Sequence, residues 1–281
     1  YYAWARGRGG GTADPEDHCA INVALYSPGG GGASRWTLTE RGRRRLHRTA
    51  DRLQVGPSSV SWDGRTLSVD IDERGAPLPF PVRGQVRVQP AALTRQDFVL
   101  DVPPRSDDGQ PACHRWWPIA PCARVEVAMQ TPSLRWSGPG YLDMNAGDEP
   151  LEQGFRDWDW SRGDLDGDTV IFYDPRGYDD STRSIALRIA PTGEIEPLTA
   201  PPRASLPTTS VWRIPRAARG EPHLPLSLVR TLEDTPFYAR SVIRTGAMGR
   251  PLIAMHESLM LTRFAAPWVQ MLLPFRMPRI P

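Results

Sequence analysis

The chain contains no lysine, since all 34 of its basic residues are arginine. This absence excludes a lysine Schiff base, pyridoxal chemistry and a P-loop. Cysteine is also scarce. The three present, Cys19, Cys113 and Cys122, have no metal-ligand spacing, and we expect reduced thiols in a cytoplasmic protein. No apolar run reaches the ~18 residues that span a bilayer, and no signal peptide is recognisable. We therefore expect no metal, no cofactor and no membrane-spanning helix.

Strong net charge is lacking as well. The formal net charge of the 281 residues is +2, and charged residues make up 23% of the chain. That balance is ordinary for a globular protein and gives no electrostatic reason to expect a nucleic-acid partner. Because the chain opens at Tyr1 rather than at methionine, within a strand-like stretch, we expect an upstream segment.

Proline and glycine are abundant, at 30 and 25 residues, and favour many short strands joined by turns. Alternating apolar and polar residues predict a buried strand at residues 19–26. The Asp63-Gly64 pair between residues 60–62 and 66–71 predicts a hairpin with a type I′ turn. Further strands are predicted at residues 85–88, 124–129, 169–173, 184–189, 210–214, 227–232, 238–244 and 252–263.

Helices are predicted only at residues 39–49 and 266–273. Breaks are expected at residues 29–32, 103–110 and 197–202. A mild shift in composition predicts two β units, residues 1–130 and residues 131–281. Strands of this number and spacing indicate an all-β protein of the sandwich or open-barrel type.

Polar and aromatic residues are concentrated between residues 114 and 162, where five of the ten tryptophans lie. Tyr141 and Asp143 are two positions apart, so in a strand their side chains face the same way, and the same holds for His114 and Trp116. An aspartate facing an aromatic interior is costly unless it is paired or used. The sequence therefore makes Asp143 a candidate for chemistry.

Each of these residues also has an ordinary structural interpretation. Asp143 and Asn145 are types common in turns, and a lone His114 is typical of a hydrogen-bonded core histidine. Trp158 and Trp160 share one strand face and are more typical of a core or a pocket wall than of catalysis. His18 has no second histidine at ligand spacing, which favours a loop residue that caps a strand over a metal ligand.

Seven collinear segments together carry a resemblance that covers essentially the whole chain. They are Tyr-Tyr-Ala-Trp-Ala-Arg at 1–6, His-Cys-Ala-Ile-Asn-Val-Ala-Leu-Tyr at 18–26, Val-Gly-Pro-Ser at 55–58, His-Arg-Trp at 114–116, Gly-Tyr-Leu-Asp-x-Asn-x-Gly-Asp-x-Pro-Leu-Glu at 140–152, Trp-Asp-Trp-Ser-Arg at 158–162 and the C-terminal residues 267–279. In these segments the chain resembles the carotenoid 1,2-hydratase (hydroxyneurosporene synthase) family, which is similar to tocopherol cyclase and to lipocalin-like two-sandwich proteins.

The resemblance implies an all-β fold of two lipocalin-like β-sandwich or open-barrel units packed together. It implies a cofactor-independent hydro-lyase that adds water across the C1–C2 double bond of acyclic carotenoids of the lycopene or neurosporene type. The implied catalytic residues are Asp143 as the acid, with His114, Trp116 and Tyr141 around it. Residues expected to bind substrate are Trp117, Trp158, Trp160 and Asn145.

Chemical reasoning suggests roles for the residues around the acid. We expect Trp116 to face the carbocation and His114 to orient Asp143 or the attacking water. Tyr141 suits either role. Two alternatives stay open at this point, namely a lipocalin-like carotenoid- or isoprenoid-binding protein without catalysis, and a glycan-active β-sandwich enzyme, because paired carboxylates beside tryptophans also suit sugars.

Two segments suit a membrane surface. Residues 41–48 hold five arginines, which form either a solvated helix face or a contact with anionic lipid headgroups. Residues 268–279 combine apolar bulk, an interfacial tryptophan and flanking arginines but are too short to span. A substrate that dissolves only in lipid implies peripheral contact, from the bacterial cytoplasm, with the inner or intracytoplasmic membrane.

Overall fold

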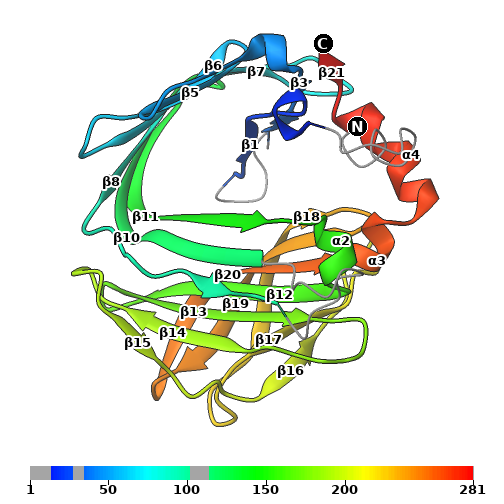
Figure 1. The fold of residues 1–281 in the computed structure, drawn as a ribbon. Coiled ribbons are helices and arrows are strands. Elements are labelled where there is room, and N and C mark those ends of the chain that lie inside the picture. Colours follow the sequence, from blue (N-terminus) through cyan, green and yellow to red (C-terminus); the bar gives the residue numbers. More distant parts are fainter. Residues whose placement is uncertain (1–13, 28–34, 102–113, 281) are drawn as a thin grey trace. The chain divides into compact units, whose positions relative to one another are not determined.

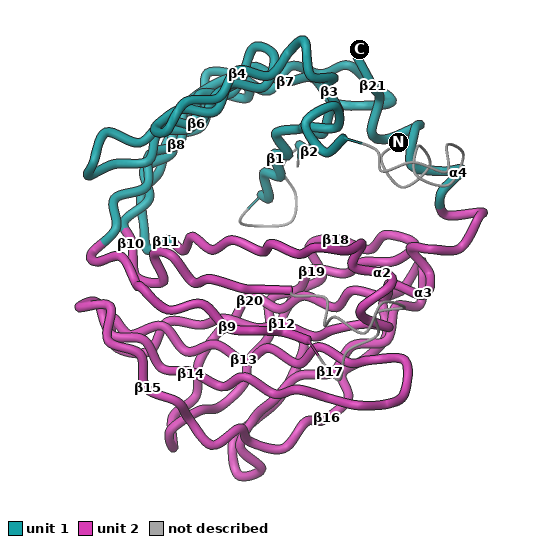
Figure 2. Tube along the Cα trace, viewed as in Figure 1, with its two compact units in different colours: residues 1–90, 124–140, 270–281 teal, residues 91–123, 141–269 magenta. Residues whose placement is uncertain are grey.

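The computed structural model describes residues 14–27, 35–101 and 114–280 (Figure 1). The described chain is built mainly from antiparallel strands with a few short helices, which confirms the predicted all-β class. It folds into two compact units, one of residues 1–90, 124–140 and 270–281 and the other of residues 91–123 and 141–269 (Figure 2). The predicted division into residues 1–130 and 131–281 differs from this grouping and stays a prediction.

Two long strands are each divided between the units, which is why residues 124–140 belong to the first unit and interrupt the second. These are β10 (His114–Thr131) and β11 (Leu134–Gly147), neighbours in one sheet. The first unit completes that sheet with β8 (Pro81–Pro90), β7 (Leu67–Arg74), β6 (Ser58–Trp62), β5 (Arg52–Val55) and β4 (Leu46–Arg48), in that order.

The remaining elements of the first unit are short. They are the 3-10 turns Pro15–Asp17 and Arg43–Arg45, the antiparallel pair β1 (Asn22–Leu25) and β2 (Arg35–Leu38), and the parallel pair β3 (Glu40–Arg41) and β21 (Arg279–Ile280). Helix α4 (Pro267–Arg276) precedes β21.

The second unit is organised around an antiparallel sheet of seven strands. Its order is β15 (Ile195–Pro197), β14 (Ile185–Ile189), β13 (Asp168–Arg176), β12 (Asp157–Leu165), β20 (Arg250–Met260), β19 (Tyr238–Ala247) and β18 (Ser227–Asp234). Also in this unit are β9 (Phe98–Val99), β16 (Arg203–Leu206), β17 (Arg216–Arg219), α2 (Leu151–Gly154) and α3 (Leu261–Phe264).

Strand β13 is buried on both faces, which explains why its sequence lacks alternation. Ile171 and Tyr173 belong to an apolar cluster on one face that also holds Trp116 of β10. Val170 and Phe172 belong to a second cluster on the other face, with residues of the β16–β17 hairpin. A strand buried on both faces is a continuous apolar run. The aromatic cluster is the one that carries the candidate site.

Most strand predictions are confirmed, and the exceptions have local causes. Residues 210–214 form no strand, because Arg213 has a φ of 54° and the carboxylate of Asp234 accepts hydrogen bonds from the backbone of Val211 and Trp212. The prediction of a type I′ turn at Asp63-Gly64 is also wrong. Of Asp63 and Gly64 only the glycine has a positive φ, and the Asp63 carboxylate caps the turn through two backbone N–H groups.

The helix predictions divide evenly. The helix predicted at residues 266–273 is confirmed from residue 267 on, where α4 begins. Residues 39–49 form strands and a single 3-10 turn, so the helix predicted there is wrong. The predicted strand at residues 252–263 ends at Met260, where α3 begins. Predictions for residues 1–4, 29–32 and 103–110 and for Cys113 lie outside the described residues.

A buried ion pair explains why the arginine-rich segment is extended. Arg41 donates from Nη2 and Nη1 to the two carboxylate oxygens of Glu73, at 2.8 and 3.1 Å. Ser58 Oγ adds a third bond to Glu73 at 2.6 Å, and the Glu73 side chain is fully buried. Gly56, at φ 62°, lies so close that a Cβ there would be 2.3 Å from Arg41 Nε. The strand conformation of residue 41 is therefore tied to β7.

This ion pair predicts that substituting Glu73 lowers the free energy of unfolding more than substituting Asp72, its neighbour on β7. Glu73→Ala leaves Arg41 buried and unpaired, which should lower the free energy of unfolding by about 3–5 kcal/mol. Asp72→Ala removes an ion pair with Arg83 that is about half exposed, and should cost less than about 1 kcal/mol. Urea unfolding of the two variants measures both values, and equal losses would contradict the assignment.

Candidate active site

A pocket of about 320 Å³ lies in the second unit, at the aromatic face of the seven-stranded sheet. It combines two carboxyl groups, one guanidinium and several aromatic rings. Its lining residues are Tyr141, Asp143, Asn145, Trp158, Trp160, Tyr173, Arg240 and Glu257. The structure thus brings together five of the site residues predicted from the sequence. It adds three residues that the sequence did not predict for the site.

Strand periodicity accounts for this lining. Tyr141, Asp143 and Asn145 alternate along β11, and Trp158 and Trp160 alternate along β12, so each set shares one face. The sheet register then puts four residues in one cross-strand row, in the order Tyr173, Trp160, Glu257 and Arg240. Neighbours in such a row are directly opposite one another.

Asp143 has two hydrogen-bond donors on the same oxygen. Trp116 Nε1 donates to Oδ2 at 2.8 Å, and the Tyr141 hydroxyl donates to Oδ2 at 2.9 Å. No hydrogen bond from another described residue reaches Oδ1. The neutral acid therefore has one oxygen that accepts two bonds and one that is available to carry the proton. Such a group is suited to general acid catalysis.

Burial sets the charge state of this group. Desolvation raises the pKa of Asp143, and the bonds from Trp116 and Tyr141 oppose the rise without cancelling it. The pKa of Tyr141 is raised well above its ordinary value, first by burial and then by the neighbouring Asp143 charge. Tyr141 is thus a permanent donor, and Asp143 retains its proton to a higher pH than a solvated aspartate.

The aromatic rings around Asp143 divide into two sets. Trp116 is fully buried, packs edge-on against Tyr173 at 5.5 Å between ring centroids, and does not line the pocket. In the structure the N–H of Trp116 donates to Asp143 and its ring lies in the core, so the expectation that Trp116 faces a cation stays a prediction. The rings that do line the pocket are those of Tyr141, Trp158, Trp160 and Tyr173.

His114 does not contact Asp143. Its Nδ1 lies 2.9 Å from Asp101 Oδ1, and its Nε2 lies 3.3 Å from the carbonyl oxygen of Glu149. A Cβ at Gly147 or Gly154 would come within 2.7 Å of the imidazole, so the ring is tightly enclosed. Of the two predicted roles of His114, the hydrogen bond to Asp143 is absent because both ring nitrogens face other acceptors. The orientation of the attacking water by His114 stays a prediction. His114 instead holds the start of β10, two residues before Trp116.

Trp117 lies away from the pocket. It follows Trp116 directly, so its side chain points to the opposite face of β10, where Nε1 donates to Thr94 Oγ1 at 2.9 Å. Tyr173, Arg240 and Glu257 are pocket residues that the sequence did not reveal. They lie in predicted strands, but only the pairing of β13, β12, β20 and β19 shows that they meet.

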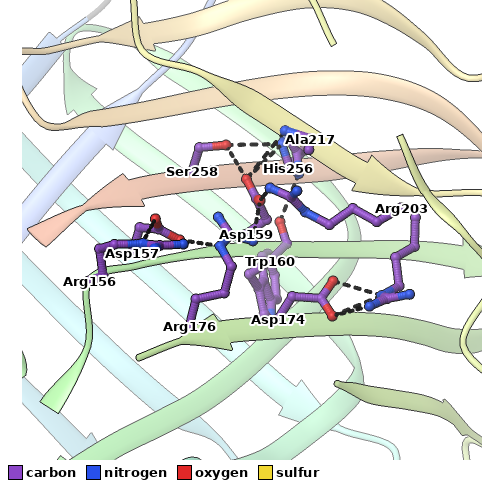
Figure 3. A network of polar contacts seen from close by, with 11 residues as sticks. Arg156, Asp157, Asp159, Trp160, Asp174, Arg176, Arg203, Ala217, His256 and Ser258 are labelled. Carbon is purple, nitrogen blue, oxygen red and sulfur yellow. Dashed lines mark hydrogen bonds and ion pairs between the residues drawn. The ribbon is translucent and has the colours of Figure 1, made fainter. Parts of the chain in front are cut away.

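A second polar network lies on the opposite face of β12 and holds the strand in place (Figure 3). Asp159, between the two pocket tryptophans, accepts bonds from Ser258 Oγ at 2.6 Å, Arg203 at 2.7 Å and Arg176 at 3.1 Å. Although burial alone would raise it, the pKa of Asp159 is lowered, chiefly by the charges of His256 and Arg176. Asp159 is therefore a structural carboxylate.

Comparison with known proteins identifies relatives over the full chain. A family model described as carotenoid hydratase CrtC matches residues 1–281. The chain is 50% identical over 280 residues to the acyclic carotenoid 1,2-hydratase of Thiocapsa roseopersicina, a match that covers 100% of the chain and 66% of that relative. It is 36% identical to the acyclic carotenoid 1,2-hydratase of Cereibacter sphaeroides, covering 100% of the chain and 94% of the relative. The chain thus spans slightly under two thirds of the Thiocapsa protein.

Among solved structures, the chain is similar to kievitone hydratase from Nectria haematococca. The TM-score is 0.53 at 10% sequence identity, and the match covers 86% of the chain and 84% of that protein. At this identity the likeness concerns the fold alone, and it agrees with the predicted lipocalin-like all-β class.

The raised pKa of Asp143 predicts how stability changes with pH. The native state keeps this proton over a window, from the ordinary pKa of 3.8 up to the raised native value, in which the unfolded chain has lost it. The free energy of unfolding should therefore fall as pH rises through that window. Asp143→Asn lacks this fall, so its stability relative to wild type should rise with pH and then level off. Urea unfolding from pH about 4 to about 8 tests this, and the reverse slope would show a lowered pKa.

Proposed function

The chain belongs to the carotenoid hydratase family, and on that premise we propose that it is an acyclic carotenoid 1,2-hydratase, a hydro-lyase that adds water to the C1–C2 double bond. The substrate class, acyclic carotenoids, comes from the names of its relatives. The lycopene or neurosporene type is what the resemblance of the sequence implies. The observation that carries the proposal is the partly buried acid Asp143, which lines an aromatic pocket and has both hydrogen-bond donors on one oxygen.

The geometry suits protonation of an alkene. The neutral Asp143 delivers its proton from Oδ1 to C2, the π electrons form the new C–H bond, and C1 becomes a tertiary cation. As Asp143 becomes a carboxylate, the bonds from Trp116 and Tyr141 strengthen and stabilise the developing charge. The ring faces of Trp158, Trp160 and Tyr173 stabilise the cation, with about 2 kcal/mol available from such a contact in a desolvated site. Water then attacks C1.

The other predicted site residues take supporting roles. Tyr141 donates to the acid, and Asn145 lies further along the same face of β11, in the more exposed part of the pocket lining. His114 acts through the position of β10 and hence of Trp116, with no contact to the reacting atoms. Trp117 does not line the pocket, so we assign it no contact with the substrate end group.

The decisive assay is incubation with lycopene in liposomes, after desalting and with a chelator present, followed by mass spectrometry. We expect products that have gained one water. Asp143→Asn retains shape but has no proton to give to carbon, so activity should fall at least ~10²-fold. Asp148→Asn, a matched control on the exposed end of the same segment, should retain near wild-type activity.

Three results would contradict this proposal. Pigment that is retained stoichiometrically without water gain would indicate a carrier. Activity lost on chelation and restored by a metal would refute cofactor independence. Near wild-type hydration by a folded Asp143→Asn variant would remove Asp143 as the acid.

Membrane contact is the second part of the proposal. Across the described residues, no helix has the length and apolarity to cross a bilayer. Helix α4 instead exposes an apolar stripe at helical spacing, with Met271 72%, Leu272 42% and Phe275 73% exposed. A short helix with this stripe and a terminal arginine, Arg276, is suited to lie in the lipid headgroup region. We place the protein at the cytoplasmic face of a bacterial inner or intracytoplasmic membrane.

The arginine-rich segment contributes less to this surface than its sequence suggests. Arg43 pairs with Asp14 and Glu16, and Arg41 is buried with Glu73. Arg44 and Arg45 line a basic pocket of about 650 Å³ and make no ion pair with any described residue. Like Arg48, which is also exposed and has no ion pair with a described residue, they are placed to meet anionic headgroups.

The apolar stripe of α4 and the pair Arg44 and Arg45 predict separable effects on binding to anionic liposomes. Met271→Ser with Phe275→Ser should weaken sedimentation with liposomes at all salt concentrations, since apolar area is lost. Arg44→Gln with Arg45→Gln should weaken binding mainly at low salt. Leu78→Ser, a loop control with 61% exposure, should bind normally. Unchanged binding in both double variants would refute the membrane contact.

A further inference from the structure

The pocket holds a second carboxyl group, Glu257, to which the protonation step gives no role. Glu257 lies on β20, directly opposite Trp160 of β12 on one side and Arg240 of β19 on the other. Addition of water releases one proton from the attacking oxygen, and a group in the pocket must accept it. The inference below rests on the proposed hydratase activity and concerns this second proton.

The environment of Glu257 contrasts with that of Asp143. Arg240 donates to Glu257 Oε1 from Nε at 3.0 Å, and its Nη2 lies 2.7 Å from the same oxygen. Both of these Arg240 contacts are on Oε1, and neither involves Oε2. One oxygen of Glu257 is thus anchored to a cation while the other is available. Asp143 has the same asymmetry, but its partners Trp116 and Tyr141 are neutral donors.

A buried polar group beside Glu257 also lacks a partner. Trp160 Nε1 is buried and has no hydrogen-bond partner among the described residues. Trp160 lines the pocket and lies directly opposite Glu257 in the sheet. A buried N–H group without an acceptor is destabilising. A water that accepts from Trp160 Nε1 and donates to Glu257 would satisfy this group.

We propose that Glu257, held by Arg240, is the base that positions the attacking water and takes its proton. A lone pair of the water oxygen forms the C1–O bond, and one O–H bond of the resulting oxonium breaks as its proton moves to Glu257 Oε2. Asp143 has then lost one proton, Glu257 has gained one, and the substrate has gained one water. Exchange with solvent water restores both groups.

The strength of the base does not limit this step. A protonated alcohol is a far stronger acid than any carboxylic acid, so a carboxylate paired with arginine is basic enough. What matters is that the carboxylate is charged and within reach when the cation forms. Its negative charge also stabilises the cation at C1 before water attacks. Acid and base thus differ because one carboxyl is buried among neutral donors and the other is paired with Arg240.

The test separates protonation from capture by water. In D₂O, Asp143 delivers deuterium to C2, and the cation either captures water or loses a proton to return to a deuterated alkene. Mass spectrometry of recovered substrate and product gives the ratio of hydration to exchange. For Glu257→Gln we expect hydration to fall about 10²-fold while exchange into recovered substrate persists. Asp143→Asn should abolish both signals.

Two variants control for structural effects. Glu233→Gln removes the other carboxylate near Arg240, 3.8 Å away and outside the pocket lining, and should leave the ratio unchanged. Glu257→Asp keeps a carboxylate and should return the ratio toward the wild-type value. If Glu257→Gln fails to fold, the ratio of hydration to exchange is measured on Glu257→Asp instead.

The outcomes are distinguishable. Hydration by Glu257→Gln near the wild-type rate would overturn the assignment and leave Asp143 as both acid and base. Parallel loss of hydration and exchange in a folded variant, or no recovery in Glu257→Asp, would also overturn it. A wild-type protein with neither signal would refute the hydratase function itself, and this inference with it.

Discussion

Burying the Asp143 carboxyl group costs more free energy when the group is ionised than when it is neutral, and the candidate site depends on this difference. Trp116 and Tyr141 both donate to one oxygen, so the neutral acid is oriented and the carboxylate that forms after proton transfer is stabilised. Other features hold these donors in position. The enclosed His114, for example, fixes the start of β10, which carries Trp116.

Two aspartates near β12 show how the same kind of side chain is given opposite properties. Asp159, on β12, is buried and surrounded by Arg176, Arg203 and His256, and its pKa is lowered. Asp143, on β11, is partly buried and has neutral partners, and its pKa is raised. One carboxylate holds the strand, and the other is available for proton transfer. The more deeply buried aspartate has the lowered pKa, so the charge of the neighbours decides the direction of the shift.

The absence of lysine is consistent with how cations are used here. Arg41 on Glu73 and Arg219 on Asp174 each bring two nitrogens to one carboxylate, and Arg240 brings two nitrogens to a single oxygen of Glu257. A planar guanidinium makes such forked contacts and is more weakly hydrated than an ammonium group, which suits buried or pocket-lining pairs. In the pocket this leaves one Glu257 oxygen fixed and the other accessible.

The sequence by itself determined the all-β class, most of the strands and the pairing of Tyr141 with Asp143 on one face, because these follow from local alternation and turn residues. Its motifs also marked Trp158, Trp160 and Asn145. Only the tertiary structure decided that His114 faces Asp101, that Trp117 points away, and that Tyr173, Glu257 and Arg240 complete the pocket. Those facts depend on strand register and on contacts between residues distant in the chain, which no local pattern encodes.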